Sequence, residues 1–342
     1  MKLINFNNDD SFFTSEDKDN FNEIVGNSIE DLKKEILKQT QETINLIYKS
    51  DNKFVYNETL NNKGLHVYRS LLANRIYEER NYSNSKEVQS LNDKGYVIID
   101  NFLSDKEFNK LTILHEQLKE TYNGKRSGTS CIIGKKDLIK FWMGNPQYFQ
   151  LIKECAHIKH LINGDLYQGY PQSKIQYLKH MPISDDGQKK MHSDVFYPII
   201  KSWIYIEDIG PSQGAFEYVP HSNLYTKNRM IWDNENSKIK RGDKLWKRRV
   251  NQKYMYNNQG MITGIRIEGK HGAFRVYENS SEVEENNEIQ RLGFNEVKSF
   301  HAPKNTLVIA NTHGFHKRGL GTIGSFRSSF WTQYRPKAFG IY

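Results

Sequence analysis

Two histidines and one aspartate are spaced in this chain as ligands for a single metal ion. His192 and Asp194 stand two residues apart, and His316 lies far downstream. Successive side chains of a β-strand point to opposite faces, so His192 and Asp194 would reach one metal from one strand while Ser193 points away. Two histidines and one carboxylate leave three coordination positions open, as in non-haem Fe(II) oxygenases. A lone His-x-Asp is common by chance, so its surroundings must support it.

The surrounding segments have the composition of strands. Four runs rich in β-branched and aromatic residues predict strands at residues 173–182, 195–206, 305–310 and 327–334. The third run leads to His316, and the fourth begins with Arg327. Arg327 and Ser329 share one face of that strand because its side chains alternate.

An ordered set of motifs resembles the phytanoyl-CoA dioxygenase family. The motifs are Lys94-Gly-Tyr-Val-Ile-Ile-Asp-Asn-Phe-Leu-Ser, His192-Ser-Asp, Gly214-Ala-Phe-Glu-Tyr-Val-Pro-His-Ser-Asn, and His316 followed eleven residues later by Arg327. The resemblance covers roughly residues 90–336. Each motif is weak alone, whereas the ordered set is specific. The chain departs from the family at Pro220-His221-Ser222-Asn223, where Pro-Gly-Ser-His is frequent, and in a long segment before His271 that looks like an insertion.

The resemblance implies a fold, an activity and a set of ligands. The expected fold is mainly β with flanking helices, around a double-stranded β-helix (jelly-roll, cupin-like) core. The expected activity is that of a dioxygenase using Fe(II), 2-oxoglutarate and O₂, which releases succinate and CO₂ and by default hydroxylates a C–H bond. His192, Asp194 and His316 would hold the iron. Related halogenases lack the carboxylate, so Asp194 favours hydroxylation, desaturation or ring formation over halogenation.

The family pattern also points to residues that would bind the cosubstrate. The planar guanidinium of Arg327 can hold the C5 carboxylate of 2-oxoglutarate through two parallel hydrogen bonds, and Ser329 can add a hydroxyl. In this family the strand at 173–182 lines the cosubstrate pocket, which makes Gln176 a candidate polar contact, with a solvent-facing position as the alternative. Trp203 is expected either beside the metal pocket or simply in the core.

His313 is the competitor of His316 for the third ligand position. His316 is preferred because its spacing to Arg327 matches the family pattern. The same step from His313 ends at Gly324, which cannot bind a carboxylate.

Composition limits the class of protein. The chain has 342 residues, a net charge of +9 and two cysteines, Cys131 and Cys155, which we interpret as reduced thiols of a cytoplasmic protein. No apolar signal region and no apolar run of about 20 residues is present, so neither export nor a membrane span is expected. The positive charge fits either a compositional bias or an anionic small-molecule substrate. No nucleic-acid-binding motif accompanies it, and we expect no nucleic-acid partner.

The chain divides into a helical N-terminal part and a larger core. We expect a loose arm over residues 1–20 and amphipathic helices over 27–48 and 66–80, so residues 1–90 form a helical extension packed on the core. These helices are also the candidate contact for an oligomer. Residues 91–342 would form the oxygenase domain. Within it, a capping box at Ser104 and Glu107 predicts a helix to about Tyr122, and another helix is expected over 147–164, with His157 and His160 as packing or surface residues.

A basic, aromatic segment at about 223–271 is the expected insertion. Its charged and aromatic members are Lys227, Arg229, Trp232, Lys238, Lys240, Arg241, Lys244, Trp246, Lys247, Arg248, Arg249, Lys253, Tyr254 and Tyr256. It reads either as a solvated loop or as a lid over an anionic substrate. Two other classes stay open for the whole chain: a jelly-roll isomerase or hydrolase with zinc or manganese, and a non-enzymatic binding protein. Arg327 argues against both, because a cosubstrate acid is the best reason for that cation.

Overall fold

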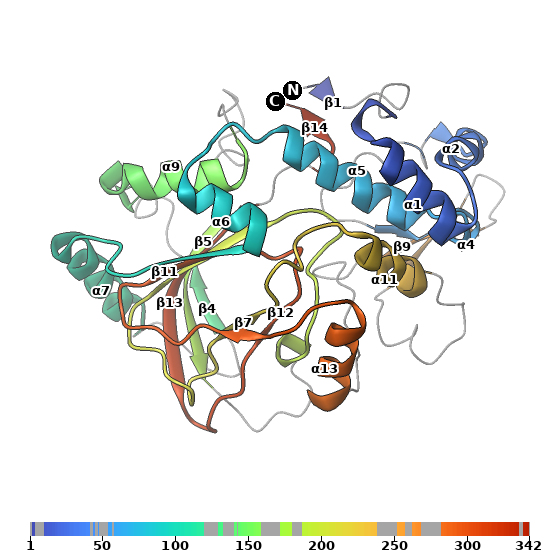
Figure 1. The fold of residues 1–342 in the computed structure, drawn as a ribbon. Helices are drawn as coiled ribbons and strands as arrows, with labels where there is room; N and C mark the ends of the chain where they lie inside the picture. The colour runs from blue at the N-terminus through green and yellow to red at the C-terminus, as the bar shows by residue number, and fades with distance from the viewer. Residues whose placement is uncertain are drawn as a thin grey trace.

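An antiparallel six-stranded sheet forms the centre of the molecule (Figure 1). The computed structural model describes residues 2–3, 10–41, 44, 47, 54–56, 58–119, 129–132, 140–141, 143–158, 172–179, 187–237, 252–256, 262–267, 282–334 and 338–341. The strand order is β3-β11-β6-β13-β5-β4. Its members are β3 (Tyr96–Ile99), β4 (Thr129–Ile132), β5 (Gln172–Lys179), β6 (Ile200–Tyr205), β11 (Leu307–Asn311) and β13 (Phe326–Tyr334).

A second, three-stranded sheet packs against one face of this sheet. Its order is β10-β7-β12, with β7 (Phe216–Tyr218), β10 (Lys298–Ser299) and β12 (His316–Arg318). Trp203 and Trp331 of the large sheet share one apolar cluster with Phe216 and Tyr218 of the small one. Because strand side chains alternate, the large sheet can present this aromatic face inward and a separate apolar face outward.

Helices cover the outward face. The helices α6 (Lys86–Lys94), α7 (Asp105–Lys119) and α9 (Pro146–Cys155) contribute to one apolar cluster with side chains of β5, β6, β11 and β13. Half of the predicted capping box before α7 is present: Ser104 Oγ accepts from the backbone nitrogen of Glu107 at 3.4 Å, while the Glu107 carboxylate accepts from the Ser104 hydroxyl at 2.9 Å instead of from its backbone nitrogen. The predicted end of α9 at 164 was too late, because this helix ends at Cys155. The predicted end of the α7 helix near 122 lies outside the described residues. Position 160 lies outside the described residues.

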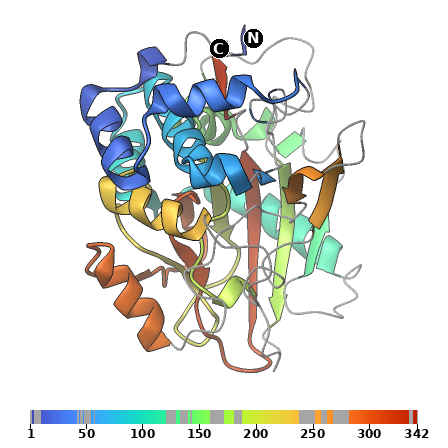
Figure 2. The same ribbon diagram turned by 90° about the vertical axis from the view of Figure 1, so that its right-hand side faces the viewer.

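The N-terminal helices form a layer with a helix from the predicted insertion. This layer contains α1 (Ser15–Val25), α2 (Ile29–Leu37), α4 (Glu58–Asn62), α5 (Leu65–Glu79) and α11 (Lys227–Ser237) (Figures 1 and 2). The prediction of a loose arm over residues 1–20 was wrong from Thr14 onward, because Thr14 and Asp17 cap α1 reciprocally. The single helix predicted over 27–48 is interrupted, since α2 ends at Leu37 and Gln41, Ile44 and Ile47 are again helical.

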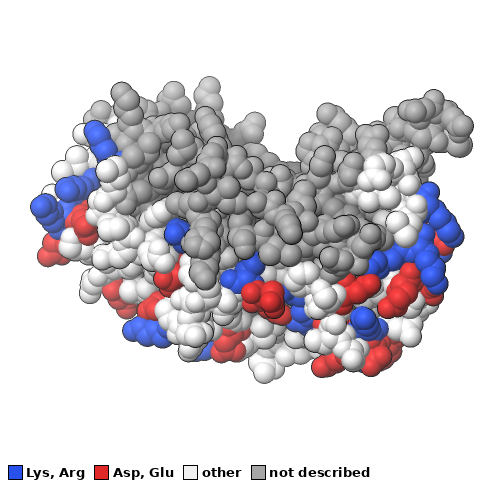
Figure 3. Space-filling view, turned by 90° about the horizontal axis from the view of Figure 1, so that it is seen from above, with Lys and Arg blue, Asp and Glu red and all other residues white. Residues whose placement is uncertain are grey.

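The remaining described elements are short. They are β1 (Lys2–Leu3) paired with β14 (Gly340–Ile341), a sheet of β2 (Phe54–Tyr56), β8 (Gln252–Tyr256) and β9 (Ile262–Ile267), the helix α13 (Glu282–Arg291) and the 3₁₀ turn η2 (Gly187–Lys189). None of the helices in the described ranges is long and apolar enough to cross a membrane. On the face shown in Figure 3, the described Lys and Arg side chains are interspersed with Asp and Glu, so this part of the surface has no patch of one sign.

Candidate functional site: a buried His-Asp-His cluster

Backbone pairing brings His192, Asp194 and His316 together. His192 N donates to His316 O at 3.0 Å, and His316 N donates back to His192 O at 2.9 Å. Asp194 N donates to Thr312 O at 3.0 Å, which attaches the aspartate to the turn before His316. The predicted strand over 195–206 was wrong in its first half, because β6 starts only at Ile200 and residues 195–197 form a bend.

The three side chains converge in a buried space. Nε2 of His192 lies 3.8 Å from Asp194 Oδ1, and Nε2 of His316 lies 3.7 Å from Asp194 Oδ2. Within the described part of the chain, these three form the only group of histidine, cysteine or carboxylate side chains placed to share an ion. Burial and the neighbouring His192 lower the pKa of His316 to about 3. Burial alone would raise the pKa of Asp194, but Lys201 and the two histidines bring it well below its usual value.

Both histidines present the tautomer that a metal requires. His192 Nδ1 lies 2.7 Å from the carbonyl oxygen of Lys190, and His316 Nδ1 lies 2.9 Å from that of Gly314. A carbonyl oxygen only accepts, so each Nδ1 carries the proton and each Nε2 keeps its lone pair toward Asp194. Two neutral imidazoles and a carboxylate are a suitable donor set for Fe(II).

Lys201 enters this site and was not among the predicted residues. Its Nζ lies 2.5 Å from Asp194 Oδ2, and the residue is 8% exposed. The signal in the sequence was the two-residue period of the strand, which puts Lys201 on the same face as Trp203.

Arg327, Ser329, Gln176 and Trp203 lie on the inner face of the large sheet. Ser329 stands directly opposite Gln176 on one side and Tyr205 on the other, and directly opposite residues of an antiparallel pair share a face. Arg327 follows on that face by alternation. Trp203 packs on Phe216 with ring centroids 4.5 Å apart, and the Phe216 ring is 5.7 Å from that of His316. Trp203 is therefore separated from the metal cluster by one aromatic ring.

This face carries buried polar atoms that lack partners among the described residues. They are Arg327 Nε, Ser329 Oγ and Gln176 Oε1. Arg327 is only 5% exposed, donates from Nη1 to Gly214 O, and has a pKa lowered by burial. A buried guanidinium needs an anion, because desolvating an unpaired charge costs several kcal/mol. An acidic cosubstrate would satisfy Arg327 and Ser329 together, so the residues present fit 2-oxoglutarate.

His313 lies apart from the cluster. Its Nδ1 is 2.9 Å from the carbonyl oxygen of Val195, and its Nε2 is 3.3 Å from Asn74 Nδ2 on α5. Burial and Arg229 lower the pKa of His313 to about 3. Because both ring nitrogens are engaged on the side of the helical layer, the geometry favours His316 over His313 as a ligand.

The structure corrects the interpretation of the basic segment in part. Arg229 is 2% exposed and Trp232 is 1% exposed, and the exposed Lys227 pairs with Glu23 of α1 at 2.7 Å. These members belong to the packed helix α11 and are not available to a lid. The basic and aromatic positions 238, 240, 241, 244 and 246–249 lie outside the described residues, as do the side chains of 253, 254 and 256.

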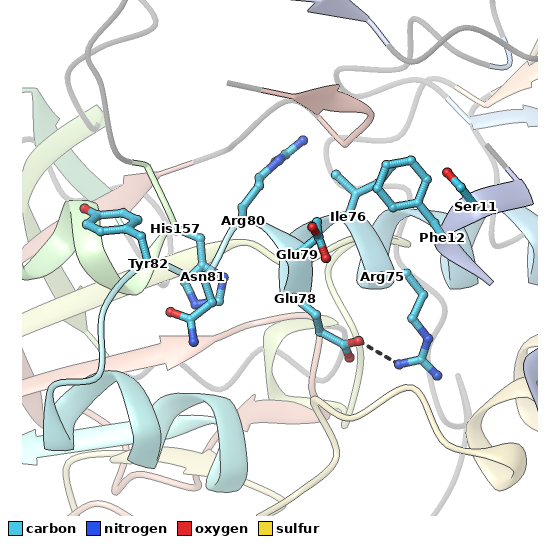
Figure 4. Close-up of a pocket in the computed structure, with 10 residues that line it drawn as sticks. All are labelled: Ser11, Phe12, Arg75, Ile76, Glu78, Glu79, Arg80, Asn81, Tyr82 and His157. Atoms are coloured by element: carbon cyan, nitrogen blue, oxygen red, sulfur yellow. Dashed lines mark hydrogen bonds and ion pairs between the residues drawn. The ribbon is translucent and has the colours of Figure 1, made fainter. Parts of the chain in front are cut away.

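A separate cavity of about 770 Å³ lies at the C-terminal end of α5 (Figure 4). None of its lining residues belongs to the metal cluster. Arg75 pairs with Glu78 at 2.7 Å and with Asp17 at 2.6 Å, so its charge is already compensated. His157 also lines this cavity, and its ring stacks on that of Tyr77 with the centroids 3.9 Å apart. It is therefore a packing residue, which is one of the two roles predicted for it. Cys155 nearby is buried and free.

One family model matches about half of the chain. The model of the family "Phytanoyl-CoA dioxygenase (PhyH)" matches residues 91–263, which include His192 and Asp194 but end before His316. No curated protein sequence matches the chain.

Solved structures to which the chain is similar include the epimerase SnoN in complex with Fe³⁺, α-ketoglutarate and nogalamycin RO (13% identity, 75% of this chain and 86% of that chain, TM-score 0.39). They also include HygX from Streptomyces hygroscopicus with nickel and 2-oxoglutarate (13%, 75% and 88%, 0.38) and EctD from S. alaskensis with 2-oxoglutarate and 5-hydroxyectoine (9%, 76% and 80%, 0.41). Sequence identities and TM-scores this low carry no argument about the substrate of this chain. The family match covers half of the chain, and the chain belongs to the phytanoyl-CoA dioxygenase family of Fe(II)- and 2-oxoglutarate-dependent oxygenases.

Proposed function

We propose that His192, Asp194 and His316 hold Fe(II) in this enzyme, and that it hydroxylates a C–H bond of a small molecule. The observation that carries the proposal is the convergence of the two histidine Nε2 atoms on the Asp194 carboxylate at 3.7 and 3.8 Å. Each imidazole is held in the metal-binding tautomer from behind by a backbone carbonyl. The iron, once bound, would supply the activation of O₂ that no side chain can provide.

The chain's own residues have distinct tasks in this reaction. Arg327 binds the C5 carboxylate of 2-oxoglutarate, and Ser329 and Gln176 contribute polar contacts from the same face of the sheet. Trp203 and Phe216 exclude water from the space beside His316. In the overall reaction, one molecule each of the C–H substrate, O₂ and 2-oxoglutarate gives one molecule each of the alcohol, succinate and CO₂.

The proposed fold is a double-stranded β-helix, formed by the large sheet and the small sheet that carries His316. The two sheets share the aromatic cluster around Phe216, which supports the assignment. In this arrangement residues 1–90 are a helical extension and residues 91–342 the oxygenase domain. Contacts of α1 and α5 with α11 support an extension that is packed on the core.

The proposed substrate is a small anionic molecule. Support comes from the basic composition of residues 238–253, which contain seven Lys and Arg before Lys253. A phosphate, sulfate or carboxylate would pair with such a segment. Neutralising Lys247, Arg248 and Arg249 together should raise the KM for the substrate, and an unchanged KM would remove the argument for an anion.

Visible absorbance of the anaerobic protein tests the iron and cosubstrate sites. Adding Fe(II) and then 2-oxoglutarate should produce a weak charge-transfer band near about 500–530 nm in the wild type. Asp194→Ala should lose the band because iron is no longer retained, and Arg327→Ala should lose it at cosubstrate concentrations that saturate the wild type. Folded wild-type protein that neither retains iron nor shows the band would refute the proposal.

A further inference from the structure

Arg229 joins, from behind, the two segments that carry the proposed ligands. It lies on α11 and is 2% exposed. Its Nη2 donates to Ser193 Oγ at 2.9 Å, and its Nη1 donates to the backbone oxygen of His313 at 3.2 Å. Ser193 stands between the first two ligands, and His313 lies three residues before the third. One guanidinium therefore spans two segments that are far apart in the sequence.

The guanidinium is itself held in place from several sides. Nη1 also donates to the backbone oxygen of Ser222 at 3.2 Å, and Asp233 Oδ1 lies 3.5 Å from Nε on the same helix. The Phe315 ring centroid is 4.4 Å from the guanidinium carbon. An arginine offers five N–H donors in a rigid fork, so it can bond several acceptors at fixed angles, which a lysine cannot.

The N-terminal layer supports the same region. Asn74 Nδ2 on α5 lies 3.3 Å from His313 Nε2, and His66 Nε2 on α5 lies 3.8 Å from Asp233 Oδ1. Ser193 Oγ in turn donates to the backbone oxygen of His313 at 2.8 Å. These contacts form a buried polar network between the helical layer and the backs of the ligand segments. A network of this kind fixes geometry when its members are satisfied.

We infer that Arg229 is a positioning residue of the metal site, which sets the separation between the His192-Ser193-Asp194 segment and the turn leading to His316. The inference rests on the proposed function of these ligands. Groups that orient metal ligands from behind change metal affinity by about 10- to 100-fold when they are replaced. Replacing Arg229 should therefore weaken metal binding, although its side chain touches neither the metal nor the cosubstrate.

Metal affinity and the spectrum of the bound metal test this role in the full-length protein. Co(II) is the probe, titrated anaerobically into wild type, Arg229→Met, Arg229→Lys and Ser193→Ala. We expect a Kd for Co(II) raised by about 10-fold or more in Arg229→Met and Ser193→Ala, with altered visible bands. The Kd of Arg229→Lys for Co(II) should lie between those of the wild type and Arg229→Met. A lysine keeps a charge beside Asp233 but cannot reach both Ser193 Oγ and the backbone oxygen of His313. The double variant Arg229→Met/Ser193→Ala should raise the Kd by less than the product of the two single effects, since both changes remove the contact between Arg229 and Ser193.

Arg291→Met is the matched control. Arg291 lies on α13, pairs with Glu235 and Glu288, and is 45% exposed, so its removal deletes an ion-paired arginine away from the ligand segments. The Kd of Arg291→Met for Co(II) and the visible spectrum of the bound Co(II) should equal those of the wild type.

The outcomes separate the inference from the function on which it rests. Folded Arg229 and Ser193 variants that bind Co(II) with wild-type affinity and spectrum would show a role in stability alone and overturn the inference. If Arg229→Met does not fold, Ser193→Ala decides, because it removes one hydroxyl only. If Asp194→Ala bound Co(II) as tightly as the wild type, the proposed metal site would instead be overturned.

Discussion

His192 and His316 exchange both of their backbone hydrogen bonds, at 3.0 and 2.9 Å, and their imidazole rings lie 4.4 Å apart. The pairing extends the small sheet beyond β12 by one bridge. The relative position of the two proposed ligands is thus set by main-chain geometry, and the side chains need only the correct rotamer and tautomer. A metal site of this kind is largely formed before the ion arrives, which lowers the cost of binding.

The two histidines of the Asn311–His316 turn should respond oppositely to substitution. His316→Ala should weaken Co(II) binding by more than about 100-fold, because a ligand is lost. His313→Ala should retain the metal but lower the free energy of unfolding by about 2–4 kcal/mol, because a fully buried ring is removed. Co(II) titration and urea unfolding measure the two effects. The reverse pattern would make His313 the ligand.

Arg327 should control affinity for 2-oxoglutarate with little effect on the metal. Two charge-assisted hydrogen bonds are worth about 3–6 kcal/mol, so Arg327→Met should raise the Kd for 2-oxoglutarate by about 100-fold or more. Arg327→Lys should be intermediate because it keeps the charge and loses the fork. Titrating the charge-transfer band measures this Kd, and the metal Kd in the same samples is the control. Equal affinity in Arg327→Met would place the cosubstrate elsewhere.

Ser329 and Ser328 form a matched pair on opposite faces of β13. Ser329→Ala should raise the Kd for 2-oxoglutarate by about 10-fold or more, because a hydroxyl that donates to a carboxylate makes a charge-assisted hydrogen bond. Ser328 pairs with Tyr177, whose ring belongs to the outward apolar face, so Ser328→Ala should change this Kd less than about twofold. Equal effects of the two substitutions would contradict the assigned inner face.

Lys201 should stabilise the protein most when no metal is bound. Lys201→Met leaves the buried Asp194 carboxylate without its ammonium partner, and breaking a buried pair in this way costs about 3–5 kcal/mol. Saturating Co(II) should reduce the loss because the ion supplies positive charge to the same carboxylate. Urea unfolding with chelator and with Co(II) gives both values. An identical loss under both conditions would show that the metal does not bind at Asp194.

His157 should make stability depend on pH through a group remote from the metal. Burial, with a smaller contribution from Arg80, lowers the pKa of His157 to about 4, below the ordinary value of about 6.5. Between these pH values the unfolded chain binds more protons than the folded chain. The free energy of unfolding therefore decreases by about 3 kcal/mol through this group as the pH falls from 7 to 4. His157→Asn removes the titration and tolerates the φ of 54°. The wild type should therefore lose more stability than this variant over that range, as urea unfolding at each pH will test.

The sequence alone was enough to predict most of the elements around the site. α5, β11 and β13 begin and end within about two residues of their predicted bounds, because period-2 and helical patterns are local properties of the chain. The errors were local as well. The run from Val195 to Tyr197 has β-branched and aromatic residues but forms a bend, since Asp194 and Ile199 are bonded to the turn at Thr312. Such long-range hydrogen bonds override strand propensity.

The candidate residues could therefore be proposed from residue types, spacing and the family resemblance: a histidine and an aspartate two apart, a later histidine, and an arginine eleven beyond it. Only the tertiary structure placed His316, and not His313, beside His192 and Asp194. It also placed Lys201 on Asp194, and it showed Arg229 as a buried contact of the ligand segments instead of a candidate lid residue. The physical reason is that each of these depends on which segments, distant in the sequence, become neighbours in the fold. A local pattern states which side chains share a face, whereas sheet register and helix packing determine which atoms they meet.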